Sequence, residues 1–522
     1  MKAAINCFAL VALVLVSISP AHGAGSRHGA IRGSTATPPV VTAPALEDYG
    51  MEVQSSEAVV RDKPELPDLS GYTREGVEAR LNGRPDGPPQ VVVQRIADVA
   101  ALGDFVDEGR AREWVVRQFS HPQAILVNSG KVTLEDVHRL VNDKRYVEKR
   151  EDGAYIVRLP LAIRQDATLV LRDDTLLLSE ERGSFIANDG WMFAIDSKIL
   201  GWREKENGPA VFRKAADFRP FFVSWGGSET FILGTEMAYL GYNQSKSYGF
   251  SVAQYSEFDN ARLKRSAPHA WLVESTFHEI YYGFYCYEAE DVAIVNNVYH
   301  DNIVYGIDPH DYSSNLIIAG NEVYGTREKH GIIISREVND SWIIGNRSYR
   351  NGLSGIVLDR QSRRNVVADN VVYDNKGDGI GLYESPDNLL WGNRLMNNLR
   401  NGIRVRNSTD VGVYHNVAVF NGTWGILGQL KDLSATDRDF EEDFYDYAVS
   451  MTVVGGELAS NASGPINTDN PQYIALYGVD MRFPRSKAGI HFSGVLGEHQ
   501  MQIFDALMNQ DRAVLLQPLS MR

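Results

Sequence analysis

A short charged segment, Asp308-Pro309-His310-Asp311, interrupts a series of apolar strands in the middle of this 522-residue chain. A histidine titrates near neutral pH, and a neighbouring carboxylate can orient it, so the two suit a general base. The proline has no backbone N–H to give to a sheet, so it weakens the strand that carries it. We therefore expect chemistry at this segment.

The segment lies within a repeat in which glycine is followed by phenylalanine or isoleucine every 23 to 25 residues. An asparagine recurs in step with the glycines, before an apolar strand in each repeat. This period, without helix-length segments, predicts an all-β fold: a right-handed parallel β-helix with short helical capping segments at its ends. The glycine pairs begin at Gly283, Gly306, Gly331, Gly355, Gly379, Gly402 and Gly425, and the asparagines are Asn297, Asn321, Asn346, Asn370, Asn393 and Asn416.

Composition divides the chain into five expected parts. Lys2, the apolar run after it and the small residues around Gly23 are typical of a cleaved export signal, which predicts a periplasmic protein. No other segment is long and apolar enough to span a bilayer. The expected parts are a signal peptide (1–23), a loose Pro-, Ser- and Glu-rich leader (24–70), an N-terminal helical cap (71–150), the β-helix with the catalytic groove (151–430), and C-terminal coils with a cap (431–522).

Charge and cysteine content narrow the function further. The formal net charge is -15, so the chain should repel nucleic acid and anionic membranes. A polyanionic substrate would need a local cationic groove. Removal of the signal would leave Cys286 as the single cysteine, at an inward strand position where a small core residue is expected rather than a nucleophile.

Strand alternation orders the side chains around each glycine. The first and third residues after it should point into the coil, and the second and fourth should point outward. Pro309 then points inward, whereas Asp308 and His310 face solvent. Coils stack about 4.8 Å apart, so equal positions form columns. The fourth-position column is Tyr287, His310, Ser335, Asp359, Tyr383 and Arg406, and the fifth-position column is Glu288, Asp311, Arg336, Arg360, Glu384 and Asn407.

These columns form an exposed strip that suits a linear acidic polysaccharide lying across the coils. Tyrosine rings stack on sugar faces, and arginine forks bind carboxylates. The residues expected to bind substrate are Asp311, Tyr287, Asp359, Arg360, Tyr383 and Arg406.

Polyuronates offer one characteristic reaction, removal of the C5 proton next to the carboxylate. His310 suits the base, either Asp308 or Asp311 can orient it, and Arg336 can neutralise the carboxylate. Tyr305, or a water, could return a proton. Return to the opposite face gives epimerisation, and loss of the C4 oxygen gives β-elimination. A polysaccharide-binding solenoid without catalysis is a further alternative, and a metal site at Asp308, His310 and Asp311 is disfavoured because three ligands so close on one strand converge poorly.

The Asp-Pro-His-Asp segment, the coil register and the export signal together resemble the periplasmic mannuronan C5-epimerases of bacterial alginate secretion. The resemblance implies conversion of β-D-mannuronate to α-L-guluronate within polymannuronate, with His310 as base and Arg336 as carboxylate neutraliser. It also implies a place in a periplasmic alginate secretion complex. The chain lacks the Gly/Asp-rich nonapeptides of the calcium-dependent secreted epimerases, so no calcium or other cofactor is expected.

Overall fold

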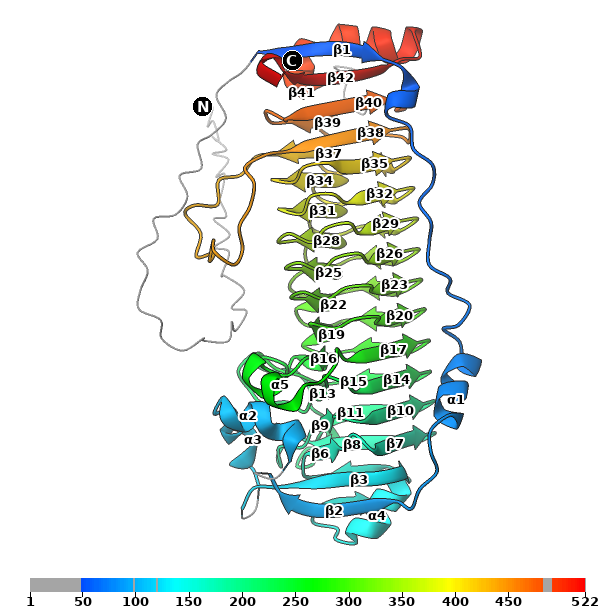
Figure 1. Ribbon diagram of the computed structural model, residues 1–522, viewed down its shortest axis with the longest axis vertical. Coiled ribbons are helices and arrows are strands. Elements are labelled where there is room, and N and C mark those ends of the chain that lie inside the picture. Colours follow the sequence, from blue (N-terminus) through cyan, green and yellow to red (C-terminus); the bar gives the residue numbers. More distant parts are fainter. Residues whose placement is uncertain (1–47, 97–98, 119–120, 482–490, 522) are drawn as a thin grey trace, which may run out of the picture.

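Three parallel sheets run the length of the molecule in a computed structural model that describes residues 48–96, 99–118, 121–481 and 491–521 (Figure 1). From Leu161 to Val419 each coil supplies one short strand to each sheet, and each strand pairs in parallel with the equivalent strand of the next coil. The fold is the right-handed parallel β-helix expected from the repeat. The predicted signal peptide lies outside the described residues.

Two of the sheets are named by what lies on them. The site sheet carries His310, and the strap sheet carries residues 48–72. The site sheet comprises β6 (Leu161–Ile163), β9 (Ile186–Asn188), β13 (Phe222–Trp225), β16 (Gly249–Ala253), β19 (Tyr282–Tyr287), β22 (Tyr305–His310), β25 (Ile332–Ser335), β28 (Ile356–Asp359), β31 (Ile380–Tyr383), β34 (Ile403–Arg406), β37 (Trp424–Gln429), β39 (Gly464–Thr468) and β41 (Ser493–Gly494). The strap sheet comprises β7 (Ala167–Arg172), β10 (Trp191–Ile195), β14 (Glu229–Leu233), β17 (His269–Val273), β20 (Ala293–Val295), β23 (Ile317–Ala319), β26 (Trp342–Ile344), β29 (Val366–Ala368), β32 (Leu389–Trp391), β35 (Val411–Tyr414), β38 (Ser450–Val454) and β40 (Tyr473–Tyr477). The third sheet comprises β5 (Tyr155–Val157), β8 (Thr175–Ser179), β11 (Lys198–Arg203), β15 (Glu236–Ala238), β18 (Thr276–His278), β21 (Val298–His300), β24 (Glu322–Tyr324), β27 (Arg347–Tyr349), β30 (Val371–Tyr373), β33 (Arg394–Met396) and β36 (Val417–Val419), with β4 (Val147–Lys149) and β12 (Gly208–Pro209) antiparallel at its margin.

The interior of the coils is a continuous aliphatic column. Ile332, Ile334, Ile356 and Leu358 are fully buried in one core cluster, as the alternation predicted. Cys286 is buried in the same cluster, which confirms its packing position. Burial of each such side chain contributes about 1.5–3 kcal/mol, so the repeat stabilises every coil through its neighbours.

The recurring asparagines form the predicted ladder. The side-chain amide of Asn370 donates to Oδ1 of Asn393 at 2.9 Å and to the carbonyl of Ile343 at 2.8 Å, while its own Oδ1 accepts from Asn346. Because buried amides must be hydrogen-bonded, the turn is held at the same place in each coil. A second asparagine ladder, which the glycine count did not reveal, contains Asn351, Asn375, Asn398, Asn421 and Asn461.

The N-terminal end of the solenoid is covered by antiparallel strands and short helices. Strands β2 (Gln90–Arg95) and β3 (Gln123–Thr133) pair with each other, and β3 also pairs in parallel with β6 and β7, so coil stacking already includes residues before 151. Helix α4 (Leu134–Val141) follows, with Thr133 as its N-cap. The helices α2 (Gly103–Asp107), α3 (Arg112–Val115) and α5 (Glu257–Leu263) lie together at this end (Figure 1).

At the opposite end, β42 (Ala513–Pro518) pairs antiparallel with both β40 and β1 (Tyr49–Gln54). The expected terminal helix is present as α7 (Gln500–Phe504), which follows α6 (Val495–Glu498) and continues into a π-helical turn at Asp505–Asn509. No helix among the described residues is long and apolar enough to cross a membrane.

The expected loose leader differs from the structure over its second part. Residues 48–72, the strap, run from β1 along the strap sheet to α1 (Arg74–Asn82), as Figure 1 shows in blue. Val59, Leu66 and Leu69 pack against the apolar outer face of that sheet. Tyr414 fastens the strap with a hydrogen bond from its hydroxyl to the carbonyl of Val59 at 3.0 Å. The apolar residues hold this segment in place despite its proline-rich composition.

Replacing Asn370 with alanine tests the asparagine ladder. The substitution leaves the carbonyl of Ile343 and the amide of Asn346 without their buried partner, so the free energy of unfolding should fall by about 3 kcal/mol. Urea unfolding followed by circular dichroism measures the change. Asn509→Ala, at an exposed position, is the control and should change stability by much less. Equal losses in the two variants would contradict a structural role for the ladder.

Candidate active site

The structure confirms the fourth-position column. His310 at the end of β22 pairs with Tyr287 on one side and with Ser335 on the other, and Ser335 pairs with Asp359. The column continues through Tyr383 to Arg406. His310 therefore lies on the outer face of the site sheet, with one side chain from each neighbouring coil beside it.

One expectation about Asp308 is wrong. Its side chain points out of the coil, but it does not face solvent, because only 2% of the residue is exposed. A cluster of aromatic rings covers the outer face here, and Tyr285 is the cross-coil partner of Asp308. Tyr248 and Tyr281 belong to the same cluster and come from preceding turns. Alternation correctly predicted the side of the strand, but not this aromatic cover.

A chain of charged contacts links His310 to the fifth-position column. Nδ1 of His310 lies 2.8 Å from Oδ2 of Asp311, and Oδ1 of Asp311 lies 3.3 Å from Nε of Arg336. Of the two candidate orienting groups, Asp311 is therefore the one in contact with the imidazole. All three side chains retain some solvent exposure, at 20% for His310 and Arg336 and 13% for Asp311.

The backbone turns sharply where these residues lie. Asp311, Arg336 and Arg360 have φ values of +33°, +63° and +52°, a left-handed conformation that is uncommon for residues other than glycine. Cross-coil hydrogen bonds hold it: the N–H of Asp311 donates to Ser335 at 3.0 Å, and that of Arg336 donates to Asp359 at 3.1 Å. The same turn repeats in each coil and aligns the charged groups at the strand ends.

An acidic loop, residues 430–449 between β37 and β38, reaches back over this edge of the site sheet (Figure 1). Asp443, which is 4% exposed, accepts a hydrogen bond from Arg336 at 2.8 Å and lies 3.3 Å from Nη1 of Arg360. Gln361 donates to the carbonyl of Phe444 at 3.1 Å and anchors the loop. A carboxylate of the protein itself therefore pairs with Arg336 and Arg360, two of the three arginines that were expected to meet substrate.

The remaining expected substrate-binding residues differ in their surroundings. Tyr287, beside His310, and Asp359, two coils further on, are both partly exposed. Tyr383 donates its hydroxyl proton to Asp378 at 3.0 Å and lies under the guanidinium of Arg406. Arg406 itself forms two hydrogen bonds, at 2.7 and 3.0 Å, to the fully buried Glu384. The structure thus places Tyr287 beside the histidine and Asp359 and Arg360 two coils further on, and it commits Arg406 to an internal pair.

Tyr305 has neighbours that the strand columns did not reveal. Nζ of Lys329 donates to its hydroxyl at 3.2 Å, and the ring of His330 stacks on its ring with centroids 6.1 Å apart. Lys329 and His330 precede Gly331, in the turn where strand alternation does not apply. A column count extended into the turns would have found them. Burial and Lys329 lower the pKa of His330 to about 4, so its ring is neutral at physiological pH.

The two carboxylates flanking His310 titrate in opposite directions. Burial raises the pKa of Asp308 to about 7, although His310 and Lys329 oppose the shift. Burial also acts to raise the pKa of Asp311, but His310 and Arg336 outweigh it and lower the pKa. For His310, burial disfavours the charged ring, yet Asp311 dominates and raises the pKa. Such opposed shifts are typical of acid–base sites.

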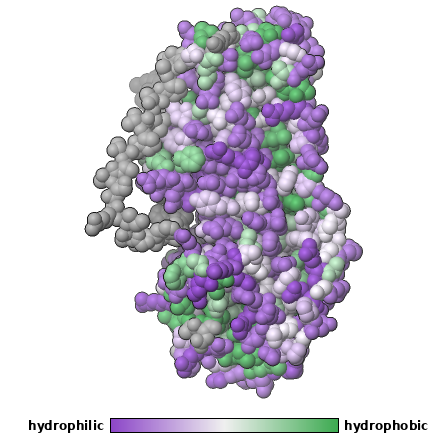
Figure 2. Space-filling view, viewed as in Figure 1, coloured by the Kyte–Doolittle hydropathy of each residue, from purple (hydrophilic) through white to green (hydrophobic). Residues whose placement is uncertain are grey.

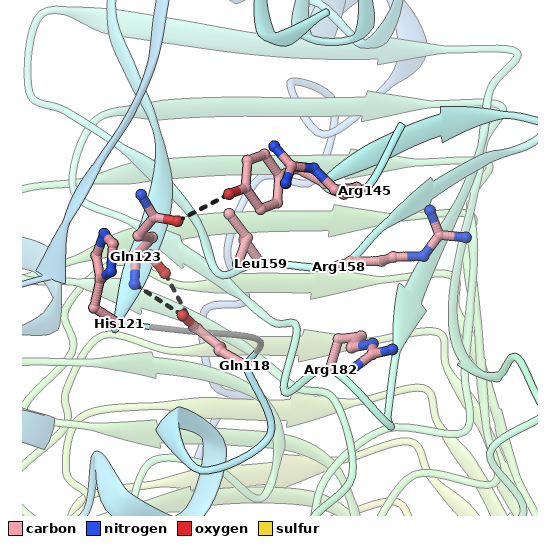
Figure 3. A pocket seen from close by; sticks show the side chains of 8 residues that line it. Gln118, His121, Gln123, Arg145, Arg158, Leu159 and Arg182 are labelled. Carbon is pink, nitrogen blue, oxygen red and sulfur yellow. Dashed lines mark hydrogen bonds between the residues drawn. The ribbon is translucent and has the colours of Figure 1, made fainter. Parts of the chain in front are cut away.

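Other surfaces fit the chemistry less well. Within the described residues, no group of three or more His, Cys, Asp or Glu side chains is arranged to hold a metal ion. Figure 3 shows a cavity at the N-terminal cap of about 10 Å³, room for one water rather than a sugar. There Tyr146 donates to Gln123, and Arg158 is paired with Glu148 and Glu204. In Figure 2 apolar side chains gather toward the end that carries α2, α3 and α5.

A parallel β-helix with a histidine–carboxylate–arginine series on one outer face defines an acid–base solenoid of the kind that acts on acidic polysaccharides. Residues 244–428 match the family model described as periplasmic copper-binding protein (NosD). A mannuronan C5-epimerase of Pseudomonas putida is 50% identical over 93% of this chain and 94% of its own length, and mannuronan C5-epimerase AlgG of Azotobacter vinelandii is 49% identical over 91% and 90%. The crystal structure of the periplasmic alginate epimerase AlgG is 48% identical and superposes with a TM-score of 0.79, covering 81% of this chain and 100% of that one. The chain belongs to the mannuronan C5-epimerase family.

The raised pKa of Asp308 predicts a pH-dependent stability difference. A carboxyl with a higher pKa in the folded than in the unfolded state stabilises the fold at low pH, and this contribution is lost as the pH rises from 3.8 to about 7. Asp308→Asn removes the titration. As the pH rises across this window, the free energy of unfolding of Asp308→Asn should therefore increase relative to that of the wild type by up to about 4 kcal/mol.

Urea unfolding at a series of pH values measures the gain. The exposed Asp374 provides the control, and Asp374→Asn should follow the wild-type dependence. A constant difference between Asp308→Asn and the wild type would show that Asp308 is not protonated preferentially in the fold.

Proposed function

We propose that this protein inverts C5 of β-D-mannuronate residues within polymannuronate, giving α-L-guluronate, and that it does so in the periplasm. The observation that carries the proposal is the contact series from His310 through Asp311 to Arg336 on the outer face of the site sheet. These groups can serve as base, orienting carboxylate and carboxylate-binding cation, and they lie along the direction in which a polymer would cross the coils. Family membership supports the same reaction.

His310 would remove the C5 proton. Its Nδ1 faces Asp311, so Nε2 remains for the sugar. Asp311 fixes the ring orientation and stabilises the imidazolium that forms, since its own pKa is lowered and it stays ionised. The raised pKa of His310 makes the neutral ring a stronger base than an unperturbed histidine.

Arg336 would neutralise the sugar carboxylate. Loss of the C5 proton puts a second negative charge next to that carboxylate, so a guanidinium held in place lowers the barrier most when the charge develops. The pKa of Arg336 is raised by Asp311 and Asp443 against the effect of burial, so it is always charged. Asp443 must then give up its hydrogen bond to Arg336 when the substrate carboxylate arrives.

A second group would return a proton to the opposite face of C5. Tyr305 is the candidate on β22, and water is the alternative. Tyr305 is buried in the same aromatic cluster as Tyr285, whose ring centroid lies 6.0 Å from that of His310. We also infer from the family resemblance that the protein works within a periplasmic alginate secretion complex.

Polymannuronate treated in D₂O tests the reaction. The wild type should give guluronate that carries deuterium at C5, detected by proton NMR, without the ultraviolet absorbance of unsaturated sugar ends. His310→Gln should lower the rate by at least about 10²-fold, because the base is lost. His415→Gln, on the strap-sheet side of a later coil, should keep the wild-type rate. Unsaturated ends would instead indicate a lyase, and full activity of His310→Gln would remove the histidine from the mechanism.

Asp443→Asn tests the exchange of carboxylates at Arg336. Removing the negative charge of Asp443 weakens its hold on both Arg336 and Arg360, so KM for polymannuronate should fall several-fold, by part of the worth of a charged hydrogen bond, with kcat retained. Steady-state kinetics on defined oligomers separate the two constants. Glu441→Gln changes an exposed charge in the same loop and is the matched control. A large loss of kcat would mean that Asp443 instead holds Arg336 in position.

A further inference from the structure

Lys329 contacts Tyr305 but has no part in the proton abstraction by His310. It lies in the turn before β25, one coil beyond Tyr305, and its backbone N–H donates to the carbonyl of Val304 at 3.2 Å. Its Nζ donates to the hydroxyl of Tyr305 at 3.2 Å and lies 5.2 Å from the centroid of that ring. A half-buried lysine directed at a buried phenol calls for a reason, because its ammonium loses hydration there.

The contact leaves the phenol with a proton to give. An ammonium group can only donate hydrogen bonds, so the oxygen of Tyr305 is the acceptor and its own O–H remains for another group. The ring is fixed by His330, stacked at an interplanar angle of 9°, and by Tyr282, whose centroid is 5.0 Å away. His330 accepts at Nδ1 from the N–H of Ser354 at 3.2 Å, so it is held in turn.

We propose that Lys329 is a positioning residue for the second proton transfer: it holds the phenol of Tyr305 and stabilises the phenolate that forms when Tyr305 gives its proton to C5. This inference rests on the proposed epimerase function. In the step, the O–H bond of Tyr305 breaks, a C–H bond forms at C5 of the sugar, and the electron pair of the carbanion becomes that bond. Lys329 then transfers a proton to the phenolate, and it and the imidazolium of His310 return to their starting states by exchange with water.

The surroundings of Tyr305 disfavour its phenolate form, which a nearby cation would stabilise. Burial raises the pKa of Tyr305 well above its ordinary value, and the carboxylates of Asp308 and Asp359 raise it further. A phenolate at this place would be strongly disfavoured without a cation in contact with its oxygen. Burial lowers the pKa of Lys329 itself, so transfer of its proton to the phenolate is downhill and restores the phenol.

A direct role in substrate binding is the competing explanation, and kinetics distinguish the two. A residue that binds the sugar equally before and in the transition state changes KM, whereas one that acts only on the second proton transfer changes kcat. A second distinction is whether the effect of removing Lys329 depends on the presence of Tyr305. If Lys329 works through the phenol, then its loss should matter only while the phenol is present.

The test compares Lys329→Met, Tyr305→Phe and the double variant with the wild type. Lys329→Met should lower kcat for guluronate formation roughly tenfold to 100-fold, with KM changed less than about twofold. Tyr305→Phe should lower it at least as much, and the double variant should be no slower than Tyr305→Phe. In D₂O, Lys329→Met should release mannuronate labelled at C5, because His310 still removes the proton while return to the opposite face is slow.

Lys198→Met, an exposed lysine on the third sheet, is the matched control and should behave as the wild type. Thermal unfolding of all variants checks the fold, and Lys329→Arg, which keeps the charge, should recover part of the rate if Lys329→Met is unstable. Multiplicative losses in the double variant, a raised KM at unchanged kcat, or full activity of Tyr305→Phe would each overturn the assignment. Absence of guluronate from the wild-type reaction would count against the epimerase function instead.

Discussion

The parallel backbone ladder between coils is the interaction on which the site depends. It brings Tyr287, His310, Ser335 and Asp359 side by side although they belong to four different coils. Side chains alternate with a period of two, so a slip of one residue would turn the histidine into the aliphatic core. The two asparagine ladders oppose such a slip, because each amide must find its partner in the next coil. The matching length of successive coils therefore determines which side chains meet in the site.

Sequence reasoning succeeded where the repeat applies and failed where it ends. The column through His310 and the buried position of Cys286 follow from local periodicity and were predicted. Burial of Asp308 was not, since alternation distinguishes inside from outside but does not reveal which turns cover the outside. The hydrogen bond from Arg336 to Asp443 was also missed, because Asp443 lies 107 residues away in an irregular loop. The roles of the site residues remain predictions that the proposed variants test.

The two carboxylates that flank His310, Asp308 in β22 and Asp311 just after it, differ in protonation because their surroundings differ. Asp311 meets an imidazole and a guanidinium and stays ionised, whereas Asp308 is covered by aromatic rings and holds its proton more tightly. The surroundings of the arginines also determine their state, since each guanidinium needs a nearby anion. Leaving Arg336 or Arg360 buried without an anion would be costly, so the acidic loop supplies one while the site is empty. A polyanion can then enter a strongly acidic protein by exchanging with charges already present.

The pairing of β1 with β42 bears on how the chain reaches this fold. Tyr49 lies opposite Pro518, so this contact joins segments near the two ends of the sequence. Contacts of such long sequence separation form late, because a large loop must close first. During synthesis from the N-terminus, the strap is made before the coils, whereas its partner strand β42 is made after them. Until β42 has β1 beside it, the terminal coil presents an unpaired strand edge that can join another chain. The chain can therefore aggregate through this edge in the interval between formation of the coils and pairing of β1 with β42.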